Sequence, residues 1–239
     1  MDSSLYVIGS RMDGLAAQLQ VIASNVANAN SAGFKRMVCT FAAQDQGATV
    51  EEDLMSPVWP ELAGMSLDTT QGAIRQTGRP LDLAIEGSGF FAVDTPDGTL
   101  YTRKGRIYQS PSGALTDASG NPYSAGGGSL RIPEGASQVT VLRNGEVIAD
   151  QQSVGKLTLM DIPDQGSLVA LGSGYYRNDG AAAKPALDTE VTQGALEESN
   201  VKPVSEMVSL IEVTRAYEAG ARVLHRMDGL SDQLIKTAA

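Results

Sequence analysis

The sequence predicts an α+β protein that is mainly β, with a central antiparallel β domain flanked by N- and C-terminal helices that pack in a coiled-coil-like manner. Three observations predict this class. The chain of 239 residues has 26 glycines, 10 prolines and only 5% aromatic residues, a composition typical of short strands joined by many turns. Both ends carry apolar residues at helical spacing, and the middle alternates with a period of two. A hydrophobic content of 42% allows a packed core.

The N-terminal region predicts a long helix. Its large apolar residues recur with alternating spacings of three and four, the pattern of a coiled-coil seam. Asn28, Asn30 and Gly33 follow this pattern, and such residues tolerate the left-handed backbone found after helix C-termini. We therefore expect an N-terminal helical region at 1–33. The seam residues are Leu5, Ile8, Met12, Leu15, Leu19, Ile22 and Val26.

The C-terminal region, at 191–239, predicts a second helix after Pro203 with the same alternation. Gly220 and Ser231 are small, which permits close approach of another helix. An ordinary amphipathic helix packed on its own domain is the alternative for either end, but two such stripes together favour contact between helices. The seam positions are Leu210, Val213, Tyr217, Gly220, Leu224, Met227, Ser231 and Leu234.

The region at 75–190 predicts one β domain. Asp97-Gly98 and Asn144-Gly145 lie between apolar runs and are strong hairpin signals, because tight turns need positive φ. Before this domain, 34–74 is expected to be an extended linker, with Pro57 and Pro60 in a loop-like stretch. The predicted strands are Leu81 to Ile85, Phe90 to Val93, Leu100 to Arg103, Val139 to Leu142, Val147 to Ala149 and Leu157 to Met160.

The charge and the hydropathy of the chain narrow its possible roles. A formal net charge of −10 argues against a nucleic-acid partner, because phosphate contacts require a basic surface. No stretch approaches the ~20 apolar residues of a membrane-spanning helix. The N-terminus has an acid where a signal peptide carries basic residues, so we expect no cleaved signal peptide. The chain is expected to be cytoplasmic or exported by another route.

The sequence offers no convincing catalytic, metal or cofactor site. Cys39 and His225 are the only residues of their types and lie far apart, so they have no zinc-ligand spacing. A Cys39/His225 dyad remains open, although a half-buried thiol and a solvated histidine are the simpler interpretation. We expect no catalytic residue, no metal and no cofactor.

Several short motifs resemble functional sequences but lack their context. The glycine-rich run 87–92 is followed by a predicted strand rather than by a phosphate-binding helix. The run 153–156 has the spacing of a serine-lysine motif without its companions. Glu86 and Asp94 would suit a glycosidase only at catalytic separation. The basic residues Arg103, Lys104 and Arg106 are expected to form an exposed charged hairpin.

Three blocks of the sequence together resemble the rod and hook family of bacterial flagellar axial proteins. They are the asparagine-rich run 24–36, the run 77–105, and the run 193–218 with its Gln-Gly-Ala-Leu start. The resemblance covers nearly the whole chain, and the short length favours the rod over the hook. The start at Leu5-Tyr6-Val7 is more similar to proximal than to distal rod members. The run Val213-Thr214-Arg215 departs from the family, which often has a glutamine before the arginine, and this leaves the subtype open.

The resemblance implies a structural subunit of the flagellar basal-body rod that polymerises through its terminal helices into an axial drive shaft needed for motility. It also implies export through the flagellar type III apparatus, a periplasmic location and other rod subunits as partners. The alternative is a peptidoglycan hydrolase or a cell-wall-binding module associated with the flagellum. The implied assembly interface comprises Leu5, Ile8, Met12, Leu15, Leu19, Ile22, Asn25, Val26, Asn28, Leu210, Val213, Tyr217, Leu224, Met227 and Leu234.

Overall fold

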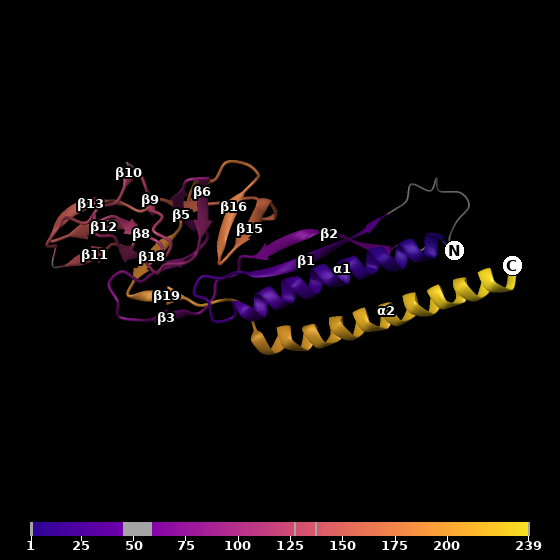
Figure 1. Cartoon of the computed structure of the whole chain (residues 1–239). Helices are drawn as coiled ribbons and strands as arrows, with labels where there is room; N and C mark the ends of the chain where they lie inside the picture. The colour runs from indigo at the N-terminus through magenta and orange to yellow at the C-terminus, as the bar shows by residue number, and fades with distance from the viewer. Residues whose placement is uncertain (1, 45–58, 127, 137, 239) are drawn as a thin grey trace. The chain divides into compact units, whose positions relative to one another are not determined.

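The computed structural model describes residues 2–44, 59–126, 128–136 and 138–238. It is mainly β with one long helix at each end, and its strands pair in antiparallel sheets, as β5 does with β6 and β4 with β18 (Figure 1). This confirms the predicted mixture of helices and antiparallel strands. The chain forms two compact units. We call the first, made of α1, α2 and the β1–β2 strands up to Met65, the helical unit, and the second, Asn28–Arg36 with Ser66–Val201, the β unit.

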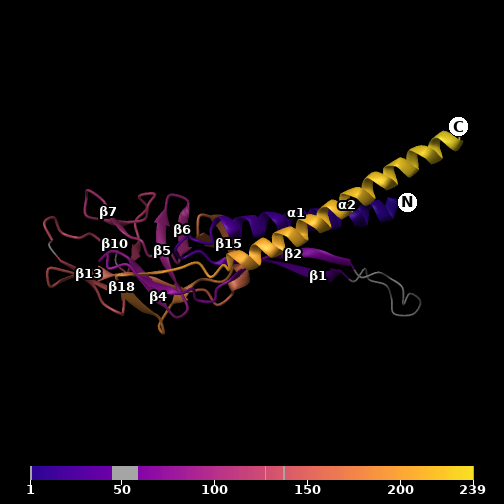
Figure 2. The ribbon, with the colours of Figure 1, turned by 90° about the horizontal axis from the view of Figure 1, so that it is seen from below.

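The helical unit contains the two predicted terminal helices, α1 (Asp2–Ala27) and α2 (Pro203–Ala238). They lie side by side and run in opposite directions (Figures 1 and 2). β1 (Arg36–Gln44) and β2 (Trp59–Asp68) form a two-stranded sheet beside them. The segment 34–74, expected to be an extended linker, therefore contains paired strands, while its part around Pro57 lies outside the described residues. Among the described residues, neither helix is both long and apolar enough to cross a bilayer.

A six-stranded sheet organises the β unit, in the order β15-β16-β6-β5-β14-β17. Its centre is the hairpin of β5 and β6, in which Thr95 pairs with Gly98 and the turn falls at Pro96 and Asp97. The predicted hairpin at Asp97-Gly98 is thus confirmed. The strands of this sheet are β5 (Phe90–Thr95), β6 (Gly98–Thr102), β14 (Leu159–Asp161), β15 (Leu168–Gly172), β16 (Tyr175–Asn178) and β17 (Lys184–Pro185).

A three-stranded sheet contains the second predicted hairpin. Gly145 has a φ of 83°, as the turn requires, and Leu142 N donates to Glu146 O at 2.8 Å. β11 (Val139–Val141), β12 (Glu146–Ala149) and β13 (Gln152–Lys156) form this sheet. A short 3-10 helix, Gln165–Ser167, precedes β15. The remaining strand pairs are β3 (Ile74–Gln76) with β19 (Ala195–Glu197), β4 (Leu83–Glu86) with β18 (Glu190–Gln193), β7 (Tyr108–Gln109) with β8 (Leu115–Thr116), and β9 (Ser124–Ala125) with β10 (Gly128–Ser129).

The apolar core of the β unit lies between these sheets. Phe91 and Tyr123 meet edge to face, with ring centroids 5.8 Å apart, an arrangement that suits the charge distribution of aromatic rings. Residues from most of the predicted strands contribute, which explains their alternating pattern. The fully buried members with the lowest exposure are Leu83, Ile85, Phe91, Val93, Ile107, Leu115, Tyr123, Val147 and Val191.

Candidate functional site

The predicted seam residues whose side chains the structure describes are buried or half-buried in the helical unit. Ile22 and Val213 are 5% and 8% exposed, so these two are buried. A side chain at Gly220 would meet Met12, whose Cγ lies 3.5 Å from the position of its Cβ. The small residue therefore allows close approach of α2 to α1, as its position in the seam indicated. The half-buried seam residues are Ile8, Met12, Leu15, Leu19, Val26, Leu210, Tyr217, Leu224 and Met227; the side chains of Leu5, Ser231 and Leu234 lie outside the described residues.

Asn25 joins three elements of the helical unit and is fully buried. Its Nδ2 donates to Met37 O at 2.9 Å and to Glu206 Oε2 at 3.2 Å, and its Oδ1 accepts from Met37 N at 2.9 Å. The amide thus fixes the end of α1 against β1 and the start of α2. Asn28 lies in the β unit, where its carbonyl and its Oδ1 both accept from Ser31, at 3.0 and 3.2 Å.

The first turns of α2 also carry an apolar surface that faces solvent. Val204 is 76% exposed, Met207 and Val208 are each 51% exposed, and Ile211 is 54% exposed. Their spacing places them on one face of the helix, opposite the inward face that includes Val213. We call these four residues the outer stripe. The sequence pattern did not single them out, because the seam explains the strongest three-four periodicity of the region.

A buried charge cluster in the β unit was not predicted. Glu197 Oε1 lies 2.6 Å from Lys35 Nζ, and Glu197 Oε2 lies 3.1 Å from Arg103 Nη1, with all three side chains at most 2% exposed. The expectation of an exposed charged hairpin is therefore wrong for Arg103. The guanidinium also lies over the Phe90 ring, 5.3 Å from its centroid. Burial lowers the pKa of Lys35, and the nearby Glu197 carboxylate opposes this shift.

The cluster holds together the three sequence blocks that carried the family resemblance. Lys35 belongs to the first block, Arg103 to the second and Glu197 to the third. Gly33 N also donates to Glu197 O at 2.8 Å, and Arg36 N donates to Asn200 Oδ1 at 2.7 Å. The sequence did contain a signal for this cluster, since each block has a charged residue beside apolar ones. A single sequence could not show that these three charged residues pair with one another.

The short motifs have structural explanations. The glycine-rich run leads into β5, a strand, as expected for a chance match to a nucleotide-binding fingerprint. Ser153 lies in β13 and donates to Glu146 Oε1 at 2.6 Å. Glu86 and Asp94 are both exposed and belong to different sheets, the β18–β4 pair and the six-stranded sheet. Burial raises the pKa of the Cys39 thiol, which disfavours the reactive thiolate.

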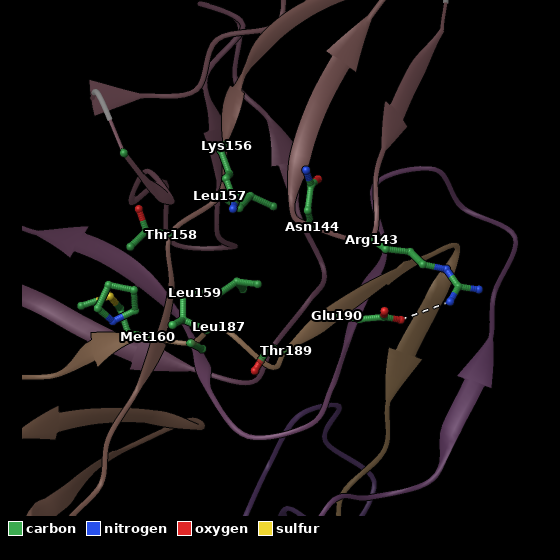
Figure 3. Close-up of a pocket in the computed structure, with 13 residues that line it drawn as sticks. Arg143, Asn144, Lys156, Leu157, Thr158, Leu159, Met160, Leu187, Thr189 and Glu190 are labelled. Carbon is green, nitrogen blue, oxygen red and sulfur yellow. Dashed lines mark hydrogen bonds and ion pairs between the residues drawn. The ribbon is translucent and has the colours of Figure 1, made fainter.

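The β unit contains an open cavity of about 520 Å³ near the β14–β17 pair (Figure 3). Leu157, Leu159 and Met160 give it an apolar wall. Arg143 and Glu190 form an ion pair of 3.1 Å at its edge, which Figure 3 shows pointing away from the leucines. Within the described residues, no group of three or more acidic, histidine or cysteine side chains could hold a metal ion.

Comparison with known proteins assigns the class. Three family models match the chain in order: the flagella basal body rod protein model at residues 5–35, the D1 domain model of flagellar hook protein FlgE/F/G at 84–149, and the C-terminal model of flagellar basal body rod FlgEFG proteins at 192–237. These matches define a structural protein of the flagellar axis rather than an enzyme.

Individual relatives cover nearly the whole chain. The flagellar basal-body rod protein FlgF of Caulobacter vibrioides is 37% identical over 239 residues, covering 99% of this chain and 98% of the relative. FlgF of Mesorhizobium japonicum is 34% identical, with the same coverage. The rod protein FlgG of Bacillus subtilis is 30% identical, covering 97% of both chains. The chain belongs to the flagellar basal-body rod protein family and is of the proximal rod type.

Proposed function

We propose that the chain is a rod subunit that joins other rod subunits through its terminal helices, in a coiled-coil-like axial assembly. Its place is the periplasmic part of the basal body, and it reaches this place through the flagellar type III export apparatus without a cleaved signal peptide. Family membership over the full length supports the role in the rod. The outer stripe on α2 is the single structural observation that supports assembly through the helices.

The outer stripe is suited to contact with a neighbouring subunit. Four large apolar side chains are exposed within two turns of one helix, and clustered exposure of this kind marks interaction surfaces. A subunit that repeats along an axis uses heterologous contacts, so one apolar surface per chain is used in every copy. The seam residues between α1 and α2 give the helix pair its form. We propose that the seam holds α1 and α2 together and that the outer stripe on this helix pair contacts the neighbouring subunit.

The test places a charge in the stripe. In cells lacking the gene, wild-type protein should restore swimming, and Val208→Asp should not, because an unpaired charge in a dry interface costs several kcal/mol. The free energy of unfolding of the purified Val208→Asp variant should lie within about 0.5 kcal/mol of the wild-type value, since Val208 is exposed. Swimming in soft agar and the rod content of isolated basal bodies are the measurements.

The matched control is Ser205→Asp. Ser205 is also exposed, and it lies about 110° around α2 from the centre of the outer stripe, beyond the edge of the stripe at Val208. It receives the same charge and should assemble and support swimming. If Val208→Asp assembles as well as Ser205→Asp, the outer stripe is not an assembly surface. If cells lacking the gene swim normally, the chain has no required role in the rod.

A further inference from the structure

We infer that Glu197 makes the docking of two segments of the β unit directional: the segment 195–200 is in place first, and it builds the socket that receives the segment 33–36. The first segment precedes α2 in the sequence, and the second follows α1. The inference concerns the order in which the unit closes and does not depend on how the rod assembles.

The socket is made of fixed polar groups of the β unit. Lys35 N donates to the Tyr176 hydroxyl at 3.0 Å, and Lys35 Nζ donates to Thr70 O at 2.7 Å. Two further contacts, Gly33 N to Glu197 O and Arg36 N to Asn200 Oδ1, depend on the segment 195–200 itself. Phe34 is 4% exposed. Together with the Lys35–Glu197 ion pair, three polar contacts of the segment 33–36 therefore require its partner segment to be in place.

Glu197, in contrast, is anchored without Lys35. Its Oε1 accepts from Gly72 N at 2.9 Å and its Oε2 pairs with Arg103. β19, to which it belongs, pairs with β3 from Ala195 to Glu197. Ala195 and Leu196 are 0% exposed, so burial also fixes this strand. These interactions persist when the segment 33–36 leaves.

The buried charges make the two segments depend on each other unequally. If Lys35 leaves, Glu197 keeps Arg103 and the Gly72 amide, and no buried charge is left alone. If Glu197 leaves first, the cations Lys35 and Arg103 remain buried without a carboxylate between them, which is strongly unfavourable. Opening of the segment 195–200 therefore requires prior opening of the segment 33–36, whereas the reverse does not hold.

Amide hydrogen exchange of the full-length chain, resolved by residue, tests this order. Amides of 33–35 should exchange at least about tenfold faster than those of 195–197, because nested openings have increasing free energies. Lys35→Met should raise the exchange rates of both segments by a similar factor and leave the ratio of the two rates unchanged. The reason is that the opening that exposes 195–197 includes the opening that exposes 33–35. Glu197→Gln should raise both exchange rates and also bring them closer to each other. It removes the ion pair with Arg103 as well as the one with Lys35, so the segment 195–200 loses its own attachment.

The control is Glu198→Gln, which makes the same chemical change one residue later. Glu198 pairs with Arg75 on the surface at 2.8 Å, with side chains 47% and 57% exposed, so both rates should stay within about twofold of wild type. Equal exchange of the two segments in the wild type, or a ratio that Lys35→Met narrows as much as Glu197→Gln does, would overturn the inference. The wild-type comparison decides the order even if Glu197→Gln does not fold.

Discussion

Gly33 shows how closely single residues are fitted in the β unit. It has a φ of 68°, in the left-handed region, and an added Cβ would lie 2.4 Å from both the carbonyl carbon and the oxygen of Arg103. Two separate constraints therefore demand glycine. The backbone angle disfavours other residues, and the neighbouring chain leaves no space for a side chain.

We expect Gly33→Ala to destabilise the protein well beyond the ~1 to 2 kcal/mol that a left-handed backbone alone costs. Backbone atoms of Arg103 cannot move aside as the end of a flexible side chain can. The midpoint of urea unfolding is the measurement. Gly78→Ala is the control, since Gly78 has a φ of 72° and nothing within 4 Å of the added Cβ. Equal losses of stability in Gly33→Ala and Gly78→Ala would show that the backbone of Arg103 can move aside.

Among the secondary-structure elements, the end of α1 depends on Asn25. The buried amide uses both its donor and its acceptor on Met37 of β1, and also reaches Glu206 of α2. A polar side chain at a buried helix position is explained by these contacts, because they give the fully buried amide of Asn25 hydrogen-bond partners.

Asn25→Ala should cost about 1 to 3 kcal/mol, because it leaves Met37 N and Met37 O without their partner. The exchange rate of the Met37 amide should rise in parallel with the loss of thermal stability. Asn30→Ala, at an exposed position in the turns after α1, should change neither measurement appreciably. A stable Asn25→Ala variant with a protected Met37 amide would contradict this role.

The seam residues are a less direct test of assembly than the outer stripe. Ile22 is 5% exposed within the chain itself, so Ile22→Asp would damage the helical unit before any subunit contact is formed. Val208, in contrast, is 51% exposed within the chain. Variants of the stripe therefore separate failure to assemble from failure to fold.

For the whole molecule, buried tyrosines predict loss of stability at alkaline pH. Burial raises the pKa of Tyr176 to about 12, and burial likewise raises the pKa values of Tyr123 and Tyr175. In the unfolded chain a tyrosine has a pKa of about 10. The unfolded state therefore releases these protons first, and stability that is fully present below pH ~10 is lost as the pH rises towards the folded pKa. Lys35, with its lowered pKa, acts in the opposite direction only up to about pH 10.5.

We expect the free energy of unfolding to fall between about pH 10.5 and 12, with Tyr176 contributing on the order of 2 to 3 kcal/mol. Urea unfolding at stepped pH values measures this. Tyr176→Phe should give a shallower fall, and Tyr108→Phe, at an exposed position, should follow the wild type. A wild-type stability that does not change up to pH 12 would contradict the burial of these hydroxyl groups.

The sequence by itself determined the helices at both ends and the hairpins at Asp97-Gly98 and Asn144-Gly145. These features depend on local periodicity and on the φ angles that turns require, and both are properties of neighbouring residues. The motif blocks also determined the family, because ordered matches at both ends and in the middle rarely arise by chance.

Only the tertiary structure decided which distant residues meet. Arg103 looked like a surface charge, yet it is buried with Lys35 and Glu197, residues 68 positions before it and 94 positions after it. The same holds for the outer stripe, which became visible only when α1 was seen to cover the opposite face of α2. Burial is a property of the packed chain, and charge pairing follows from burial, so neither could be deduced from the spacing of residues along one sequence.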